Sequence, residues 1–522
     1  ADLPKSVLEG LNADQKEVVA AVLKGRNVLV TGGAGVGKTF VGDRIKLALQ
    51  HKYKSDFDEV VAVTAATGTA AVLNGGCTLH ALAGIGAPKT LQAFRKLRKS
   101  CIRRIWETLE VLIIDEVSML SGEFFDLLEH EVRFVRNGCK DVPSAAFGGL
   151  QVIIIGDFFQ LPPVPERSQL RFVDERLLKE EKRAVLLSGS EKSRRAGKVV
   201  ASTECFLNRG MLFESEAFWN LRPLVVELET NYRQRDDQTY MSKLNDLREG
   251  RDLREAVAWF SDHCHRPMLD RCDDAIMLFP TNNKVDGENA RRLAILPGLE
   301  KVFIAKDSTR VHKSKDKHQT DLAENATIAE LTEAEKEHIL MKSSFFLKGS
   351  MGCDAASHIA LKVGARVMLC ANIDSDDGLI NGVMGTVTSF RVPGVWVDFD
   401  GLGRRFVKKH EFRSDMPGIG TCIRKQLPLR LAYAITHHRS QGKTLSRVRV
   451  DPGAFCPGQC YVALSRAMNS SGLELLNPLL QSSVRVNKAS LRFQQLALRE
   501  KKLDQARKKL AGRWRAIDPW SS

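Results

Sequence analysis

The fold is decided by residues 28–39, which read VLVTGGAGVGKT. An apolar run leads into a glycine-rich loop, and a helix is predicted to begin at about Lys38. In this setting the pattern G-x-x-x-x-G-K-[ST] predicts a P-loop, whose backbone N–H groups surround phosphate oxygens. Lys38 is then expected to reach the β- and γ-phosphates of ATP, and the Thr39 hydroxyl to ligate Mg²⁺. The residues predicted to bind the nucleotide here are Gly32, Gly33, Ala34, Gly35, Val36, Gly37, Lys38 and Thr39.

Further short apolar runs follow at residues 60–63, 111–114 and 151–155, each ending at a turn. Runs of this kind are typical of buried parallel strands. Together with the first run they predict a doubly wound α/β sheet that binds its ligand at the carboxyl ends of the strands. Asp115 and Glu116 follow one of these runs. We expect Asp115 to hold the Mg²⁺ and Glu116 to polarise the attacking water.

The composition bounds the class of protein. The chain has 522 residues, which corresponds to about three domains of ordinary size, and it carries a net charge of +15. Such a basic excess indicates a polyanionic partner, usually nucleic acid, although charge can also serve solubility alone. No stretch approaches the roughly 18 consecutive apolar residues of a membrane span. The 11 cysteines are an odd number, which favours reduced thiols inside a cell.

Two other nucleotide-binding patterns are discounted. Residues 283–286 read NKVD and match a guanine-reading motif, but they lie far along the chain from Lys38. A second Gly-Lys-Thr begins at Gly442, but His437 stands where a P-loop needs its first glycine. We therefore expect one phosphate-binding loop and no specificity for a guanine nucleotide.

Further segments extend the pattern along most of the chain. They read LNADQ (11–15), TAATGTAA (64–71), TLH (78–80), GDFFQLPP (156–163), FESEAFW (213–219), NYRQ (231–234), AYAITHHRSQGKTL (432–445) and YVALSRA (461–467). Together with the P-loop, their order resembles that of the Pif-type (petite integration frequency) 5′→3′ DNA helicases of superfamily one, B branch. The resemblance runs from about residue 11 to residue 476.

The resemblance implies roles for particular residues. Gln15 would select adenine, and Gln160 would sense the γ-phosphate. Arg233 and Arg466 would stabilise charge on the transferring phosphoryl group. Gly442 would belong to the motif that links the nucleotide to DNA. The residues expected to contact DNA are Thr67, Gly68, His80, His438 and Arg439, with Arg439 standing where the family leads us to expect Lys.

The resemblance also implies a domain plan of two RecA-like P-loop lobes with an inserted small wedge subdomain and an inserted SH3-like barrel. The first lobe would be residues 1–220, with a strand-separating wedge at about 78–108 and a polar insertion at about 166–210. The second lobe would be residues 221–360 and 426–480, and residues 361–425 would form a small SH3-like barrel. Alternating β-propensity and Asn-Gly or Asp-Gly turns in that last range independently predict short strands. Residues 481–522 would be a basic helical tail, and residues 301–345 a further insertion.

The function implied is an ATP-dependent 5′→3′ helicase that moves on single-stranded DNA and unwinds duplex, forked or structured DNA. The family places such enzymes in the nucleus or mitochondrion, in DNA repair, recombination, replication and telomere maintenance. We expect a monomer in solution that can pair on DNA, with ATP and Mg²⁺ as cofactors. Two alternatives remain open: an ATPase that remodels protein–DNA complexes without unwinding, and a DNA-binding scaffold without catalysis.

Overall fold

The computed structural model describes residues 5–86, 88, 91–142, 144–164, 206, 208–265, 275–312, 325–326, 355–374, 377–416 and 420–497. The chain forms two compact units, one of residues 1–271 with 440–522 and the other of residues 272–439. Parts of the predicted insertions (166–205, 313–324 and 327–345) and of the tail (498–522) lie outside the described residues. Within the described ranges, no helix has the length and apolar character needed to cross a membrane.

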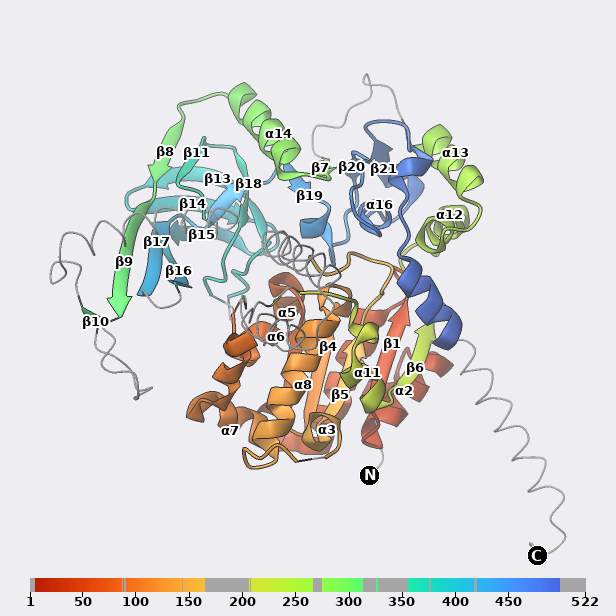
Figure 1. Ribbon diagram of the computed structural model, residues 1–522. Helices are drawn as coiled ribbons and strands as arrows, with labels where there is room; N and C mark the ends of the chain where they lie inside the picture. The colour runs from red at the N-terminus through yellow and green to blue at the C-terminus, as the bar shows by residue number, and fades with distance from the viewer. Residues whose placement is uncertain are drawn as a thin grey trace, which may run out of the picture. The chain divides into compact units, whose positions relative to one another are not determined.

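The first unit is built on a parallel six-stranded sheet in the order β3-β2-β4-β5-β1-β6. Figure 1 labels β4, β5, β1 and β6 of this sheet. Its strands are β1 (Val28–Gly32), β2 (Val61–Ala65), β3 (Cys77–Thr78), β4 (Val111–Asp115), β5 (Gln151–Ile155) and β6 (Leu224–Leu228). The four strands predicted from apolar runs are β1, β2, β4 and β5, so the predicted parallel α/β sheet is confirmed. Because all six run the same way, the loops after β1, β4 and β5 emerge at one edge.

Helices cover both faces of this sheet, which explains its uniformly apolar strands. Val28 and Val30 of β1 pack with helices α2 (Ala13–Leu23) and α3 (Lys38–Tyr53). Leu29 points to the other face and packs with α8 (Gly122–Arg136) and α11 (Glu216–Leu221). The shorter helices of this part are α1 (Lys5–Leu8), α4 (Phe57–Val60), α5 (Gly68–Leu73), η1 (Lys54–Asp56), η3 (Val117–Met119), η4 (Ala146–Gly149) and η5 (Leu212–Glu214).

The range 78–108 is a basic helical segment packed on α8. It contains α6 (Leu79–Leu82), η2 (Leu91–Arg98) and α7 (Ser100–Thr108). Phe94, Leu97 and Trp106 bury their side chains in the core beside α8. The basic side chains that remain exposed include Arg95, Lys99, Arg103 and Arg104. The segment is thus anchored by its apolar residues and presents its cations to solvent.

The first unit is completed by elements far along the chain. They are α12 (Gln238–Glu249), α13 (Leu253–Cys264), β20 (Val448–Val450), α16 (Gln459–Leu464), η9 (Ser470–Gly472), β21 (Leu473–Leu475), η10 (Gln481–Ser483) and a helical segment at residues 488–497. β20 and β21 pair in parallel, and α12 contacts α13 and α16. The segment 488–497, blue in Figure 1, lies beside β6, where Gln494 contacts Glu227.

The second unit consists mainly of antiparallel sheets. One has the order β15-β14-β13-β12-β18 and another the order β10-β9-β17-β16, and β8 pairs with β11. Their bounds are β8 (Lys301–Ile304), β9 (Lys306–His312), β10 (Asn325–Ala326), β11 (His358–Leu361), β12 (Arg366–Leu369), β13 (Met384–Arg391), β14 (Gly394–Phe399), β15 (Gly403–Lys408), β16 (His410–Met416), β17 (Gly420–Gln426) and β18 (Leu429–Leu431). The short strands expected at 361–425 are therefore present.

A parallel pair, β7 (Ile276–Phe279) with β19 (Ala434–Thr436), and helix α14 (Asn282–Ile295) accompany these sheets. The 3₁₀ turn η8 (His438–Ser440) follows β19. The NKVD residues 283–286 lie inside α14, in the unit that does not contain the P-loop. A guanine-reading role for them has no structural basis.

Candidate active site

The predicted P-loop connects β1 to α3 at the carboxyl edge of the parallel sheet. Gly35 and Gly37 have φ of +81° and +83°, which glycine adopts without the steric cost of a side chain. Lys38 Nζ donates hydrogen bonds to the carbonyls of Gly32 (2.9 Å) and Gly33 (2.7 Å). Thr39 is exposed in the first turn of α3. Val36 is buried in the core beneath the loop.

Opposite charges converge on the Lys38 ammonium. Burial lowers the pKa of Lys38, while the carboxylates of Asp157 and Glu116 oppose that change. Both carboxylates follow strands of the same sheet, so the sheet topology explains why they meet the lysine. A polyphosphate bound here would face this lysine and the positive end of α3.

Gln15 lies at the P-loop and carries an unsatisfied donor. It is the third residue of α2, and its Oε1 accepts the Asn12 N–H (3.0 Å) in a capping box. Its Nε2 is buried and has no hydrogen-bond partner among the described residues. A Cβ placed on Gly37 would lie 3.1 Å from this nitrogen and 3.4 Å from the Tyr232 ring. An amide donor beside an exposed aromatic ring suits an adenine base.

Asp115, predicted to hold Mg²⁺, is the last residue of β4. Its Oδ1 accepts the Glu116 N–H (2.7 Å), and its Oδ2 accepts Asn74 Nδ2 (2.7 Å). Burial, and then the Glu116 charge, raises the pKa of Asp115 to about 6. Each carboxylate oxygen keeps a second lone pair for a cation.

These residues fit a Mg²⁺ ion that is completed by phosphates and water. In the described ranges, no group of three or more His, Cys, Asp and Glu side chains could cage a metal. Mg²⁺ in nucleotide sites is ordinarily held by one or two protein oxygens, with the remaining ligands from phosphate and water. Asp115 and the Thr39 hydroxyl would supply such oxygens.

Glu116 meets two residues from the far end of the chain. Gln441 Nε2 donates to Glu116 Oε2 (3.1 Å), and also to Ser118 Oγ (3.2 Å). A Cβ placed on Gly442 would lie 3.6 Å from Glu116 Oε1, so Gly442 borders the same carboxylate. The glutamate is thereby oriented by a neutral amide, which leaves its charge available to a water molecule.

The loop 156–160 after β5 is held by a buried ion pair. Asp157, with 0% exposure, contacts the Arg248 guanidinium of α12 at 3.0 and 3.2 Å. Burial lowers the pKa of Arg248, but the Asp157 carboxylate outweighs this effect and raises that pKa above its usual value. Tyr461 Oη donates to Asp157 Oδ2 (3.3 Å) and accepts the N–H of Ala34 (2.7 Å), which ties the P-loop to this pair.

Gln160 ends this loop in a buried position. Its Oε1 has no hydrogen-bond partner among the described residues. Buried polar atoms are normally paired, so an orphaned amide oxygen at a nucleotide site indicates a place for a ligand or water. A Cβ on Gly458 would lie 2.5 Å from the Gln160 carbonyl, so the turn before α16 packs closely on the loop.

The two predicted arginines lie together. Arg233 Nη1 donates to the Ser465 carbonyl (3.2 Å), and Arg466 Nε donates to the Val462 carbonyl (2.7 Å). Burial, and then Arg233, lowers the pKa of Arg466 to about 10, while Glu116 acts in the opposite direction. Burial also lowers the pKa of Arg233. Two desolvated cations of this kind would be stabilised by an incoming phosphate anion.

The predicted DNA contacts fall in both units. Thr67 Oγ1 accepts the Ala70 N–H (3.3 Å) at the start of α5, and a Cβ on Gly68 would meet nothing within 4 Å. The His80 ring packs 4.4 Å from that of Phe124, and burial lowers the pKa of His80 to about 4. His80 is therefore neutral at pH 7 and would contact a phosphate as a hydrogen-bonding group rather than as a cation.

His438 and Arg439 belong to the second unit. They lie in η8, where the Arg439 N–H donates to Thr436 Oγ1 (3.3 Å). Burial lowers the pKa of His438. All the residues predicted to act on the nucleotide, by contrast, lie in the first unit.

Sequence reasoning missed several residues of this site. Asn74, Gln441, Asp157, Arg248 and Tyr461 each contact a predicted residue or loop. Asp157, Gln441 and Tyr461 lie inside quoted motifs, which was a usable signal. Asn74 and Arg248 carry no such signal, because their contacts depend on the packing of α5 and α12.

Comparisons with known proteins agree with this geometry. The family described as PIF1-like helicase matches residues 10–182, and that described as DNA helicase Pif1, 2B domain matches residues 353–390. The ATP-dependent DNA helicase PIF1 of Xenopus laevis is 32% identical over 536 residues, which cover 96% of this chain and 67% of that protein. The ATP-dependent DNA helicase PIF1 of Emericella nidulans is 31% identical over 538 residues, which cover 91% of this chain and 61% of that protein. The chain thus spans about three fifths to two thirds of these relatives.

Solved structures match over nearly their whole length. The crystal structure of Pif1 helicase from Candida albicans gives a TM-score of 0.69 at 29% identity, covering 93% of this chain and 99% of that one. The crystal structure of Pif1 helicase from Bacteroides in complex with ADP-AlF3 and ssDNA gives a TM-score of 0.66 at 26% identity, covering 94% of this chain and 97% of that one. A structure that describes DNA unwinding at forked dsDNA by two coordinating Pif1 helicases gives a TM-score of 0.67 at 25% identity, covering 94% of this chain and 98% of that one.

Proposed function

We propose that this chain, which belongs to the PIF1-like helicase family, is an ATP-dependent helicase that moves 5′→3′ along single-stranded DNA and unwinds duplex or structured DNA. The observation that carries the proposal is the convergence of Lys38, Glu116, Arg233 and Arg466 in one compact unit. These are the cations and the carboxylate that phosphoryl transfer to water requires. The relatives' names and the DNA-bound structures support DNA as the partner.

In this proposal each residue has a defined task. The P-loop amides and Lys38 bind the phosphates, and Gln15 reads the adenine. Thr39 and Asp115 hold Mg²⁺, which would neutralise phosphate charge. Glu116, oriented by Gln441, accepts a proton from the attacking water. In this proposal the acceptor of the phosphoryl group is water.

Two further tasks complete the hydrolytic step. Gln160 places its amide toward the γ-phosphate, and Arg233 and Arg466 stabilise the transferring phosphoryl group. An arginine in such a position is worth about 10³-fold or more in rate. Loss of the γ-phosphate then removes the anion that held the two cations together, which is the change a motor can convert into movement.

The proposed helicase function also assigns the residues that would contact DNA. Thr67, Gly68 and His80 of the first unit and His438 and Arg439 of the second would contact the sugar-phosphate chain. The exposed cations on segment 78–108 would lie at the strand-separation point as a wedge. The antiparallel β region of the second unit would form the SH3-like barrel near the DNA. Binding through phosphates predicts a steep loss of affinity with salt.

The cellular role is part of the proposal. A helicase of this family would serve genome maintenance, with the nucleus or mitochondrion as its compartment. It would act as a monomer that pairs on forked DNA, which the structure of two coordinating Pif1 helicases supports.

Steady-state ATPase with and without a single-stranded oligonucleotide tests the motor. We expect strong stimulation by DNA in the wild type and none in Lys38→Ala. ATP hydrolysis that is indifferent to DNA would refute the helicase, and absence of hydrolysis would favour the scaffold alternative.

Unwinding is tested separately with 5′-tailed and 3′-tailed duplexes. Deleting the proposed wedge is unsuitable, because Phe94, Leu97 and Trp106 belong to the core. Arg95→Ala, Lys99→Ala and Arg104→Ala together remove exposed cations only. We expect this variant to keep DNA-stimulated ATPase and lose unwinding of the 5′-tailed duplex. Unchanged unwinding would refute the wedge, and faster unwinding of the 3′-tailed duplex would refute the direction.

A further inference from the structure

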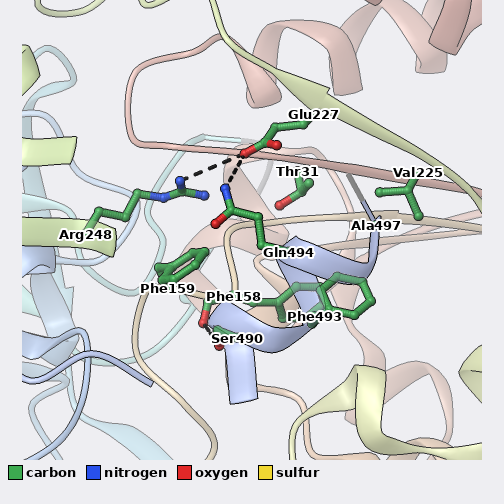
Figure 2. Close-up of a pocket in the computed structure, with 10 residues that line it drawn as sticks. All are labelled: Thr31, Phe158, Phe159, Val225, Glu227, Arg248, Ser490, Phe493, Gln494 and Ala497. Atoms are coloured by element: carbon green, nitrogen blue, oxygen red, sulfur yellow. Dashed lines mark hydrogen bonds and ion pairs between the residues drawn. The ribbon is translucent and has the colours of Figure 1, made fainter. Parts of the chain in front are cut away.

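The helical segment 488–497 contacts the loop that carries Gln160. Ser490 has 1% exposure, and its Oγ donates a hydrogen bond to the Phe158 carbonyl at 2.7 Å. Phe158 lies two residues before Gln160 in the loop after β5. A residue near the end of the described chain therefore fixes the backbone of the loop proposed to sense the γ-phosphate (Figure 2).

The same loop is held by aromatic packing. The Phe493 ring, 6% exposed, stacks on Phe213 at 4.5 Å and meets Phe158 edge-on at 5.5 Å. Phe158 also meets Phe213 edge-on at 4.9 Å. The segment 213–219, whose role the sequence left open, thus supplies the other side of the cluster. Phe158 is enclosed between that segment and the helical segment 488–497.

A polar connection reaches the loop by a second route. Gln494 Nε2 donates to Glu227 Oε1 at 2.9 Å, and this oxygen lies 4.0 Å from Arg248 Nη1 (Figure 2). Arg248 in turn pairs with Asp157 and places its guanidinium 4.4 Å from the Phe159 ring. The helix is therefore linked to three consecutive loop residues.

The space between these residues is nearly filled. A cavity of about 20 Å³ lies among Phe158, Phe159, Phe493 and Gln494, which is room for about one water molecule. A ligand does not fit there, so the contact is a packing interface. Such interfaces respond to the loss of a single side chain because interiors are close-packed.

We infer that the segment 488–497 is a positioning element of the ATP site, with Ser490 and Phe493 holding Phe158 so that the Gln160 amide keeps its place. The inference rests on the proposed function, in which Gln160 senses the γ-phosphate. Ser490 and Phe493 touch no nucleotide in this scheme and act through the loop alone. Loosening them should weaken recognition of the γ-phosphate more than binding of the rest of the nucleotide.

The test compares the affinities of a fluorescent ADP and a fluorescent non-hydrolysable ATP analogue in the presence of Mg²⁺. In Phe493→Leu we expect the preference for the triphosphate to fall about tenfold, which corresponds to about 1.4 kcal/mol. In Ser490→Ala we expect a fall of about threefold, in line with the loss of one hydrogen bond. ADP affinity should stay within about twofold in both, and kcat should fall in parallel with the triphosphate preference.

Two control variants separate positioning from general loosening. Gln495→Ala changes an exposed neighbour on the same helical segment. Phe147→Leu opens a comparable hole in the same core, where Phe147 packs 5.0 Å from Phe125. Both controls should keep the wild-type preference. Ser490→Ala removes only a hydroxyl, so its triphosphate preference still tests the inference if Phe493→Leu fails to fold.

The outcomes distinguish the inference from the proposed function. If the wild type shows DNA-stimulated ATPase while both test variants keep its triphosphate preference, the inference is overturned and the function stands. If Phe147→Leu lowers the preference as much as Phe493→Leu, the effect is general loosening and the inference is overturned. If the wild type hydrolyses no ATP, the proposed function falls and the inference falls with it.

Discussion

Replacing Arg248 with alanine should destabilise the first unit strongly. The guanidinium has 4% exposure and contacts Asp157, which has 0% exposure, at 3.0 and 3.2 Å. Removing one partner of a buried pair leaves an uncompensated charge and typically costs about 3–5 kcal/mol. Asp157 would retain the Phe159 N–H (3.1 Å) and the Tyr461 hydroxyl (3.3 Å), so we expect the lower end, about 3 kcal/mol.

The assay is urea unfolding followed by circular dichroism, with Arg103→Ala as the matched control. Arg103 pairs with Glu107 at 2.9 Å, but its side chain is 44% exposed, and such a pair is worth about 0.5 kcal/mol. Adding Asp157→Asn to Arg248→Ala should recover part of the loss, because the orphaned charge is then gone. A cost for Arg248→Ala no greater than for Arg103→Ala would refute the reasoning. The reasoning would also be refuted if the losses of unfolding free energy from Arg248→Ala and Asp157→Asn were additive within about 0.5 kcal/mol in the double variant.

Three further predictions address the nucleotide, the metal and pH. Gln15→Glu keeps the oxygen that accepts the Asn12 N–H and replaces the free Nε2 donor, so the ATP-over-GTP preference of the folded variant in ATPase assays should fall about tenfold or more. An unchanged preference would contradict the adenine role. Asn74→Ala removes the 2.7 Å hydrogen bond to Asp115, and the Mg²⁺ concentration for half-maximal ATPase should rise about tenfold; an unaltered Mg²⁺ titration would disprove this role. His80 has a pKa of about 4 in the fold against 6.5 when free, so its contribution to stability is complete above pH 6.5 and is lost as the pH falls toward 4. His80→Gln should reduce the loss of unfolding free energy between pH 6.5 and pH 4, measured by urea unfolding, by up to about 3 kcal/mol. A loss as steep as in the wild type would contradict this prediction.

The sequence predicts the sheet of the first unit well because its signals are local. The strands β1, β2, β4 and β5 are short apolar runs with turn residues after them, and the P-loop spacing fixes the chemistry at the end of β1. Glu116 and the P-loop both follow strands of one parallel sheet, which places them at the same edge. The family could be identified from motifs that are each a short continuous stretch, and the relatives and family models confirm it.

Contacts that depend on packing could not be predicted in this way. Arg248 stands in QTYMSKLNDLRE, a largely polar helix in which an arginine would ordinarily be solvated. Its burial is decided by Asp157, which needs a cation once β5 is covered on both faces. Asn74 and Phe493 are likewise assigned by neighbours distant in sequence. The antiparallel strands were foreseen as strands, but their pairing into separate sheets requires long-range register.

The hydrogen bond between Ala34 and Tyr461 joins residues 427 positions apart, and this distance matters during synthesis. A growing chain exposes its P-loop long before Tyr461, Arg466 and Phe493 leave the ribosome. The parallel sheet can collapse early, but the hydrolytic half of the site closes only after synthesis has passed Arg466. A chain whose translation stops between Leu228, where β6 ends, and Tyr461 would contain the whole parallel sheet and the P-loop but would lack Tyr461 and Arg466. Termination in this interval should therefore produce fragments that keep the phosphate-binding loop and lack Arg466.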